Sequence, residues 1–287
     1  MLDREEFIEQ AYFFRTLRER VENGTPVQEI LASVREEILA TTKLPMAVDF
    51  LMGELQLKGR LGDGMGRLPH YFTSFQSFII KRAEDDRARL DFQIALHILE
   101  REAEFRGSDS MQPAALFIYQ FECLARNRLG YDIGMSAIAD DPAYSEGWRT
   151  WIRRIRFELG TVDFASLVFQ QSQLNLEEIR RQRRDPDYGA DIPILFNMQA
   201  GRIARANRGK DPLYLFAALQ RQLAYPVVPR PKATSAGYAF PPQVELRFQR
   251  LEARMTLLEQ EQKGGLDLTK FYQSGETPPT ASSSEET

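Results

Sequence analysis

Residues 24–39 have the sequence Gly-Thr-Pro-Val-Gln-Glu-Ile-Leu-Ala-Ser-Val-Arg-Glu-Glu-Ile-Leu. Gly24 can end a preceding helix, because glycine adopts the left-handed conformation at little cost. Thr25 and Gln28 have the spacing of a capping box, and Pro26 stands at a first helical position, where proline is tolerated. The apolar residues that follow recur at helical spacing: Ile30, Leu31, Val34, Ile38 and Leu39. The stretch therefore predicts that one helix ends and another begins here.

Similar start and stop signals recur along residues 1–225. They predict helices over residues 3–24, 26–39, 45–59, 73–107, 111–129, 145–159 and 211–224, with a break in the fourth near residues 84–86. The apolar arc of residues 90–107 is too wide for a surface helix, so we expect burial on two sides. These segments cover more than half of residues 1–225, against a usual helical share of about one third. The expected fold class is all-α, with a multi-helix domain over residues 1–225.

One region of this domain is ambiguous. Residues 162–176 fit either a buried helix or a strand, and residues 192–196 resemble a short strand. The sequence therefore also allows a minor two-stranded β element around residues 162–196.

The C-terminal region has a different composition. Residues 226–242 contain five prolines, which predicts a stiff linker. Residues 243–263 then carry apolar side chains at alternating steps of four and three, typical of a short coiled coil. These residues are Val244, Phe248, Leu251, Met255 and Leu258. They predict self-association, the alternative being an amphipathic helix that packs on its own domain. Residues 264–287 are expected to be a disordered tail.

Charge is unevenly distributed along the chain. Residues 1–146 contain 17 basic and 25 acidic residues, a net charge of −8, whereas residues 147–232 contain 15 and 8, a net charge of +7. The basic part of the helical domain (147–225) either neutralises the acidic part (1–146) or faces an anionic partner. We favour internal neutralisation, because arginine commonly forms intramolecular ion pairs.

Three arginine clusters lie in the basic part. Arg149, Arg153 and Arg156 form a stripe on the predicted helix over residues 145–159, and two further clusters follow. The candidate polyanion-binding residues are Arg149, Arg153, Arg156, Arg181, Arg184, Arg202, Arg205 and Arg208. Such clusters could follow a nucleic-acid backbone. However, the sequence pI of about 5.5 is low for a nucleic-acid-binding domain, so solvated or ion-paired arginines are the favoured interpretation.

Evidence for catalysis in the sequence is weak. His97, Glu100 and Glu104 share one helical face and could bind a metal, but the motif occurs once and His97 lies among core positions. No residue spacing in the sequence indicates a base that could activate Cys123 as a nucleophile, and the residue fits a buried core position. The glycine-rich run over residues 59–67 lacks the context of a phosphate-binding loop and suggests a flexible connector. We therefore expect no catalytic residues, no metal and no cofactor, with a metal-dependent enzyme as a third possibility.

Location and partners follow from composition. The longest stretch without Asp, Glu, Lys or Arg is 13 residues, too short to span a bilayer, so no membrane association is expected. Charged residues at the N-terminus do not fit a signal peptide, and the single cysteine suits a cytoplasmic location. The favoured function is that of a non-catalytic helical interaction or assembly module that self-associates or binds a protein partner. Nucleic-acid binding is the alternative.

Overall fold

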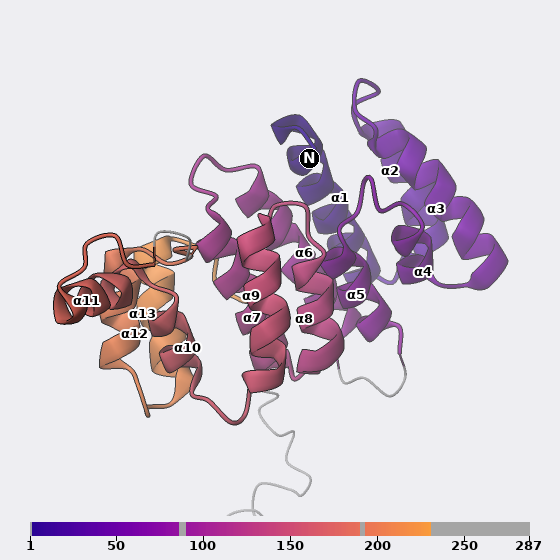
Figure 1. The fold of residues 1–287 in the computed structure, drawn as a ribbon. Coiled ribbons are helices and arrows are strands. Elements are labelled where there is room, and N and C mark those ends of the chain that lie inside the picture. The colour runs from indigo at the N-terminus through magenta and orange to yellow at the C-terminus, as the bar shows by residue number, and fades with distance from the viewer. Residues whose placement is uncertain (1, 86–89, 190–192, 231–287) are drawn as a thin grey trace, which may run out of the picture. The chain divides into compact units, whose positions relative to one another are not determined.

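The computed structural model describes residues 2–85, 90–189 and 193–230, which form thirteen helices and no strand (Figure 1). This confirms the all-α fold class for the described part of the chain. The predicted coiled-coil segment and tail, and residues 231–242 of the predicted linker, lie outside it. The helices are α1 (Arg4–Glu22), α2 (Val27–Glu37), α3 (Leu44–Lys58), α4 (Leu61–Gly66), α5 (Ser74–Ala83), α6 (Phe92–Arg106), α7 (Pro113–Asn127), α8 (Tyr131–Ala139), α9 (Glu146–Glu158), α10 (Phe164–Gln170), α11 (Gln173–Arg183), α12 (Met198–Ala206) and α13 (Pro212–Leu223).

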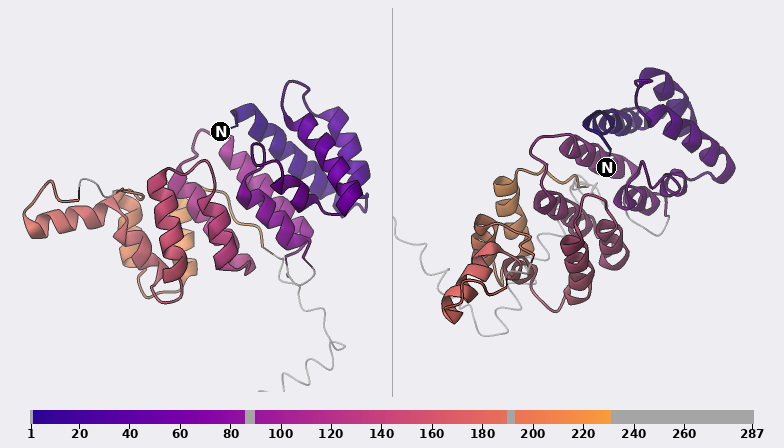
Figure 2. Two further views of the ribbon diagram at one scale, coloured as in Figure 1. Left: turned by 45° about the vertical axis from the view of Figure 1, so that its right-hand side comes forward. Right: turned by 45° about the horizontal axis from the view of Figure 1, so that its top comes forward.

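The helices pack largely as neighbouring pairs. α2 packs on α3, α4 on α5 and α8 on α9, while α1 lies along α6 and α10 along α12. In Figures 1 and 2, α3 lies at one end of this helical unit and α11 at the other. Among the described helices, α3 contacts α1, α2 and α4, so part of its surface has no described helix against it. Among the described helices, none has both the length and the hydropathy needed to cross a bilayer.

Local signals place most helix ends correctly. The capping box of Thr73 and Gln76 forms with both of its hydrogen bonds, and Gly59 ends α3 in the left-handed conformation. The capping box predicted at Thr25 does not form. α2 begins one residue later than predicted, with Pro26 as its N-cap in extended conformation. α2 also ends at Glu37, before the predicted Leu39.

The glycine-rich run over residues 59–67 was predicted to be a flexible connector. This prediction is wrong, because the run contains the short helix α4. Its glycines allow close contact with neighbouring helices. A Cβ added at Gly62 would lie 2.8 Å from the backbone nitrogen of Lys81, and one at Gly64 would lie 2.9 Å from the Leu51 side chain. The run therefore serves packing, which the spacing of glycines alone does not reveal.

We expect opposite effects from alanine at two helical glycines. Gly62→Ala should destabilise the fold by about 1–3 kcal/mol, because the new methyl group overlaps backbone that cannot move freely. Gly53→Ala should stabilise it by about 0.5–1 kcal/mol, since nothing lies within 4 Å of the new Cβ and alanine favours helix. Urea unfolding of both variants measures this, and equal effects would contradict the packing role of α4.

The possible β element around residues 162–196 does not form. The apolar run makes α10 and the start of α11, and only isolated bridges are present in the described residues, Leu159 with Val162 and Ser172 with Phe196. Asp163 and Ser172 explain the outcome, because each caps the following helix with its side chain. Helix capping thus decides that this run is helical, where its hydrophobic pattern fits either a helix or a strand.

An aromatic cluster occupies the core between α7, α9 and α10. Phe117 is completely buried at its centre. Its ring centroid lies 5.6 Å from that of Trp148, 5.0 Å from that of Trp151 and 6.4 Å from that of Phe164. Phe196 packs edge-on against both tryptophans. The cluster fixes α9 and the extended segment before α12 in one arrangement.

Candidate interaction surfaces and binding groove

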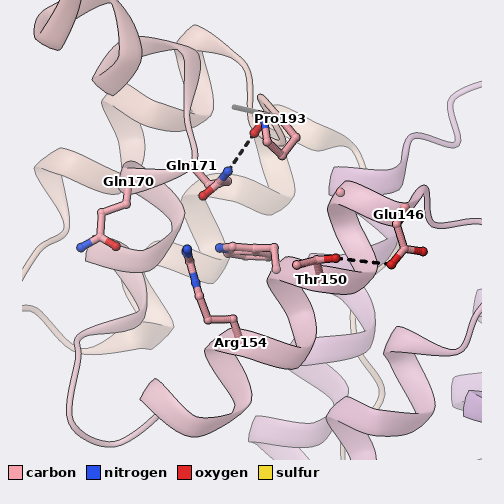
Figure 3. Close-up of a pocket in the computed structure, with 8 residues that line it drawn as sticks. Glu146, Thr150, Arg154, Gln170, Gln171 and Pro193 are labelled. Carbon is pink, nitrogen blue, oxygen red and sulfur yellow. Dashed lines mark hydrogen bonds between the residues drawn. The ribbon is translucent and has the colours of Figure 1, made fainter. Parts of the chain in front are cut away.

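An open groove of about 750 Å³ lies between α9 and the C-terminal end of α10 (Figure 3). Its lining residues are Glu146, Gly147, Thr150, Trp151, Arg154, Gln170, Gln171 and Pro193. Those from α9 occupy one helical face, because they are spaced at one-turn intervals. The opposite wall comes from Gln170 and Gln171 at the end of α10 and from Pro193, which precedes α12 in the chain.

The two walls of the groove are fixed by close contacts. The Gln171 side-chain amide donates to the Pro193 carbonyl oxygen at 2.8 Å, and the backbone nitrogen of Leu195 donates to the Gln171 carbonyl oxygen at 3.1 Å. Gly147 permits the approach of α9, because a Cβ there would lie 2.9 Å from the Pro193 ring. Backbone and side-chain contacts thus hold Gln171, Pro193 and α9 close together.

Polar groups of both signs line this groove. Arg154 extends from α9 toward Gln170 and Gln171 on the other wall (Figure 3). Glu146 lies two helical turns away and accepts a hydrogen bond from Thr150 at 3.4 Å. An apolar floor with a few polar groups is typical of a ligand site.

A second surface feature is an apolar stripe on α3. Met46, Phe50 and Leu57 have exposed fractions of 76%, 38% and 81%, and Gly53 lies exposed between them. We call these four residues the α3 stripe. Their steps of four, three and four keep them on one side of the helix. The other side of α3 is buried against the core, so α3 has apolar residues on both sides.

Two of the candidate polyanion-binding arginines pair with the acidic part of the chain. Arg153 lies 3.2 Å from Asp140, and Arg156 lies 3.3 Å from Asp132 and stacks on Phe157. Asp132 lies in α8 and Asp140 is the C-cap of α8, so these contacts join the basic helix α9 to α8. Arginine charge in this stripe is therefore partly neutralised within the fold.

The remaining candidate arginines lie in different surroundings. Arg181 pairs with Glu177 at 3.5 Å, and Arg205 pairs with Glu178 across α11 and α12. The guanidinium of Arg208 stacks on the Phe169 ring. Within the described residues, four candidates form no ion pair: Arg149, Arg184, Arg202 and Arg208. Polyanion binding stays a prediction, with half of its residues already engaged by carboxylates.

The residues of the possible metal site have other roles. The Glu100 carboxylate accepts hydrogen bonds from both Arg15 and Arg18 at 2.9 Å, and Glu104 pairs with Arg15. Burial favours a raised pKa for Glu100, but the two guanidinium groups lower it overall. Burial lowers the pKa of His97. These ion pairs join α1 to α6, and no group of three metal-ligating residues occurs in the described part of the chain.

The single cysteine is enclosed in the core. Cys123 on α7 is completely buried, and burial raises the pKa of its thiol well above the ordinary value. A nucleophilic cysteine needs the opposite shift. Its surroundings therefore fit a packing role.

A charged network that the sequence analysis did not single out lies inside the fold. Arg106 on α6 donates to Glu102 at 2.9 Å and to both carboxylate oxygens of Asp141. Gln120 on α7 donates to Glu102 at 2.7 Å and accepts from the Tyr144 hydroxyl. All five residues are buried, and burial raises the pKa of Glu102. The network joins α6, α7 and the loop before α9.

Comparison with protein-family models, curated proteins and solved structures finds no match to this chain. Functional inference therefore rests on the groove and the surfaces described above.

Neither the groove nor the α3 stripe was predicted from the sequence, because each depends on how the helices pack. The groove joins Trp151 to Pro193, which are 42 positions apart, and no local pattern brings them together. The α3 stripe has a helical spacing that is visible in the sequence. However, α3 is apolar on both sides, so its periodicity did not show which side would be exposed.

Proposed function

We propose that the chain is a protein-interaction and assembly module without catalytic activity, which self-associates through residues 243–263. The α3 stripe supports this function most directly, because its apolar side chains are exposed to solvent. A contiguous apolar surface on a soluble domain is typical of a contact site for another protein. The cytoplasmic location expected from the single cysteine belongs to the same proposal.

The occupant that we propose for the α3 stripe is the segment 244–258 of a second copy of the chain. Apolar residues in the stripe and in the segment follow the same alternation of four and three, as the seam of two packed helices requires. At 1.5 Å per residue, the stripe is about 16 Å long and the segment, if helical, about 21 Å. The segment is therefore long enough to cover the stripe, and reciprocal exchange between two chains would close a dimer.

Light scattering on the full chain tests this proposal. The wild-type chain is expected to have at least twice the monomer mass of 33.0 kDa. Leu57→Asp and Leu251→Asp should each return it to the monomer mass, because either change places a charge in the apolar seam. Tyr214→Asp on α13 is the matched control, since Tyr214 is exposed but lies outside the stripe.

Two outcomes would contradict parts of the proposal. A wild-type chain with the monomer mass at every concentration would exclude self-association. If Leu251→Asp lowered the mass and Leu57→Asp did not, the segment would associate without the α3 stripe, as in a coiled coil of two such segments.

A further inference from the structure

The groove between α9 and α10 contains an unpartnered donor in its apolar floor. Trp151 is buried, and its indole N–H has no hydrogen-bond partner among the described residues. A buried donor without an acceptor is costly, so such groups usually find a partner in the protein, in water or in a ligand. The indole N–H of Trp151, a residue that lines the groove, therefore lacks the acceptor that such a donor usually has.

Further donors lie at the same end of the groove. The Arg154 side chain is 53% exposed, and its Nε is 3.5 Å from a Glu158 oxygen, which leaves the outer guanidinium nitrogens available. Gln170 lies on the opposite wall (Figure 3). A guanidinium group binds a carboxylate through two parallel hydrogen bonds. One cation and two neutral donor groups at one end therefore favour a carboxylate as ligand.

The other end of the groove has the opposite charge. Glu146 lies eight residues before Arg154 on α9, about 12 Å along the helix axis. Between them, the groove is lined by Pro193 and by the edge of Trp151, a residue that is only 3% exposed. An extended peptide advances about 3.3–3.6 Å per residue, so three to four residues span this distance. A peptide with two free ends would match both charges.

We infer that the α9–α10 groove binds a short extended peptide, whose free C-terminal carboxylate lies against Arg154 and Trp151 and whose amino group lies at Glu146. The two charged ends set the length and direction of the ligand. The apolar floor contacts whatever side chains point toward α9. This site is separate from the α3 stripe, and it does not depend on self-association.

Titration of the ¹⁵N-labelled full chain with tetra-alanine tests the inference. The chain has two tryptophans, so it shows two indole N–H resonances, which a Trp151→Phe variant assigns. The Trp151 resonance is expected to shift downfield and to saturate, with a smaller change at Trp148. Tetra-alanine amide, which lacks the carboxylate, should bind at least about tenfold more weakly, because a charge-assisted hydrogen bond is lost.

A matched pair of arginine variants locates the site. Arg154→Met should weaken tetra-alanine binding about tenfold or more. Arg153→Met should leave it unchanged, because Arg153 is equally exposed on the same helix but pairs with Asp140 outside the groove. Both variants remove one exposed charge, so a difference between them cannot reflect net charge.

Four results would overturn the inference. The first is the absence of a saturable shift at Trp151. The second is equal affinity for the free acid and the amide, and the third is an equal loss of binding in both arginine variants. The fourth is binding of free alanine as tight as that of tetra-alanine, which would exclude a ligand that spans the groove.

Discussion

Arg106→Met should lower the free energy of unfolding by about 3–5 kcal/mol, because it leaves buried carboxylates without their cation. The guanidinium of Arg106 lies between Glu102 and Asp141, and all three side chains are at most 1% exposed. Burial alone would lower the pKa of Arg106, yet the two carboxylates raise it overall. Methionine fills much of the same volume, so the expected cost is electrostatic rather than a cavity.

Chemical unfolding monitored by far-UV circular dichroism measures the effect. The control is Arg4→Met, because Arg4 forms an ion pair with Asp109 in which both side chains are largely exposed. Exposed pairs contribute about 0–1 kcal/mol, so this control should change stability little. A similar small change in Arg106→Met would contradict the role assigned to the buried network.

A double variant identifies the cause of the loss. Glu102→Gln combined with Arg106→Met removes one of the two stranded carboxylates while keeping its shape. The double variant should therefore be more stable than Arg106→Met alone. If it is less stable, the loss comes from packing around residue 106 and not from unpaired charge.

The sequence predicted helices best where local chemistry decides them. The predicted helix start at residue 73 and the predicted helix end at residue 59 depend on contacts within one turn, and both are confirmed. Some predictions were wrong where packing or a helix end decided the outcome. Gly62 lies in α4 close to Lys81, where a flexible connector was predicted, and Leu39 is exposed beyond the end of α2, where an apolar helical face was predicted. The helices α8 and α12 were not predicted at all.

For the candidate surfaces too, the sequence identified residues, whereas only packing decided their contacts. The arginines of the basic part could be named from the sequence, but which of them pair with acidic residues depends on packing. Arg153 meets Asp140 because α8 and α9 are adjacent, whereas Arg202 has no ion pair in the described residues. Spacing identified residues on one helical face, and only the fold showed what that face meets.

Phe117→Ala is expected to cost about 3–5 kcal/mol of unfolding free energy, as large-to-small changes of a buried phenylalanine do. The ring of Phe117 is fully buried against both tryptophans. Its removal leaves a cavity that the helices α7 and α9 cannot close, because Phe196 and the Pro193 segment hold α9 from the other side. Phe157→Ala, at an exposed position on α9, is the control and should cost less than about 1 kcal/mol.

The same variant tests whether the groove depends on the aromatic core. Trp151 contacts Phe117 on one side and lines the groove on the other. If the core fixes this ring, Phe117→Ala should broaden or shift the Trp151 indole resonance in the folded protein and weaken tetra-alanine binding, even though residue 117 does not line the groove. Unchanged binding, together with the expected loss of stability, would show that Gln171 and Pro193 alone hold the groove in shape. The free energy of unfolding thus measures what Phe117 contributes to stability, and tetra-alanine binding measures what it contributes to the shape of the groove.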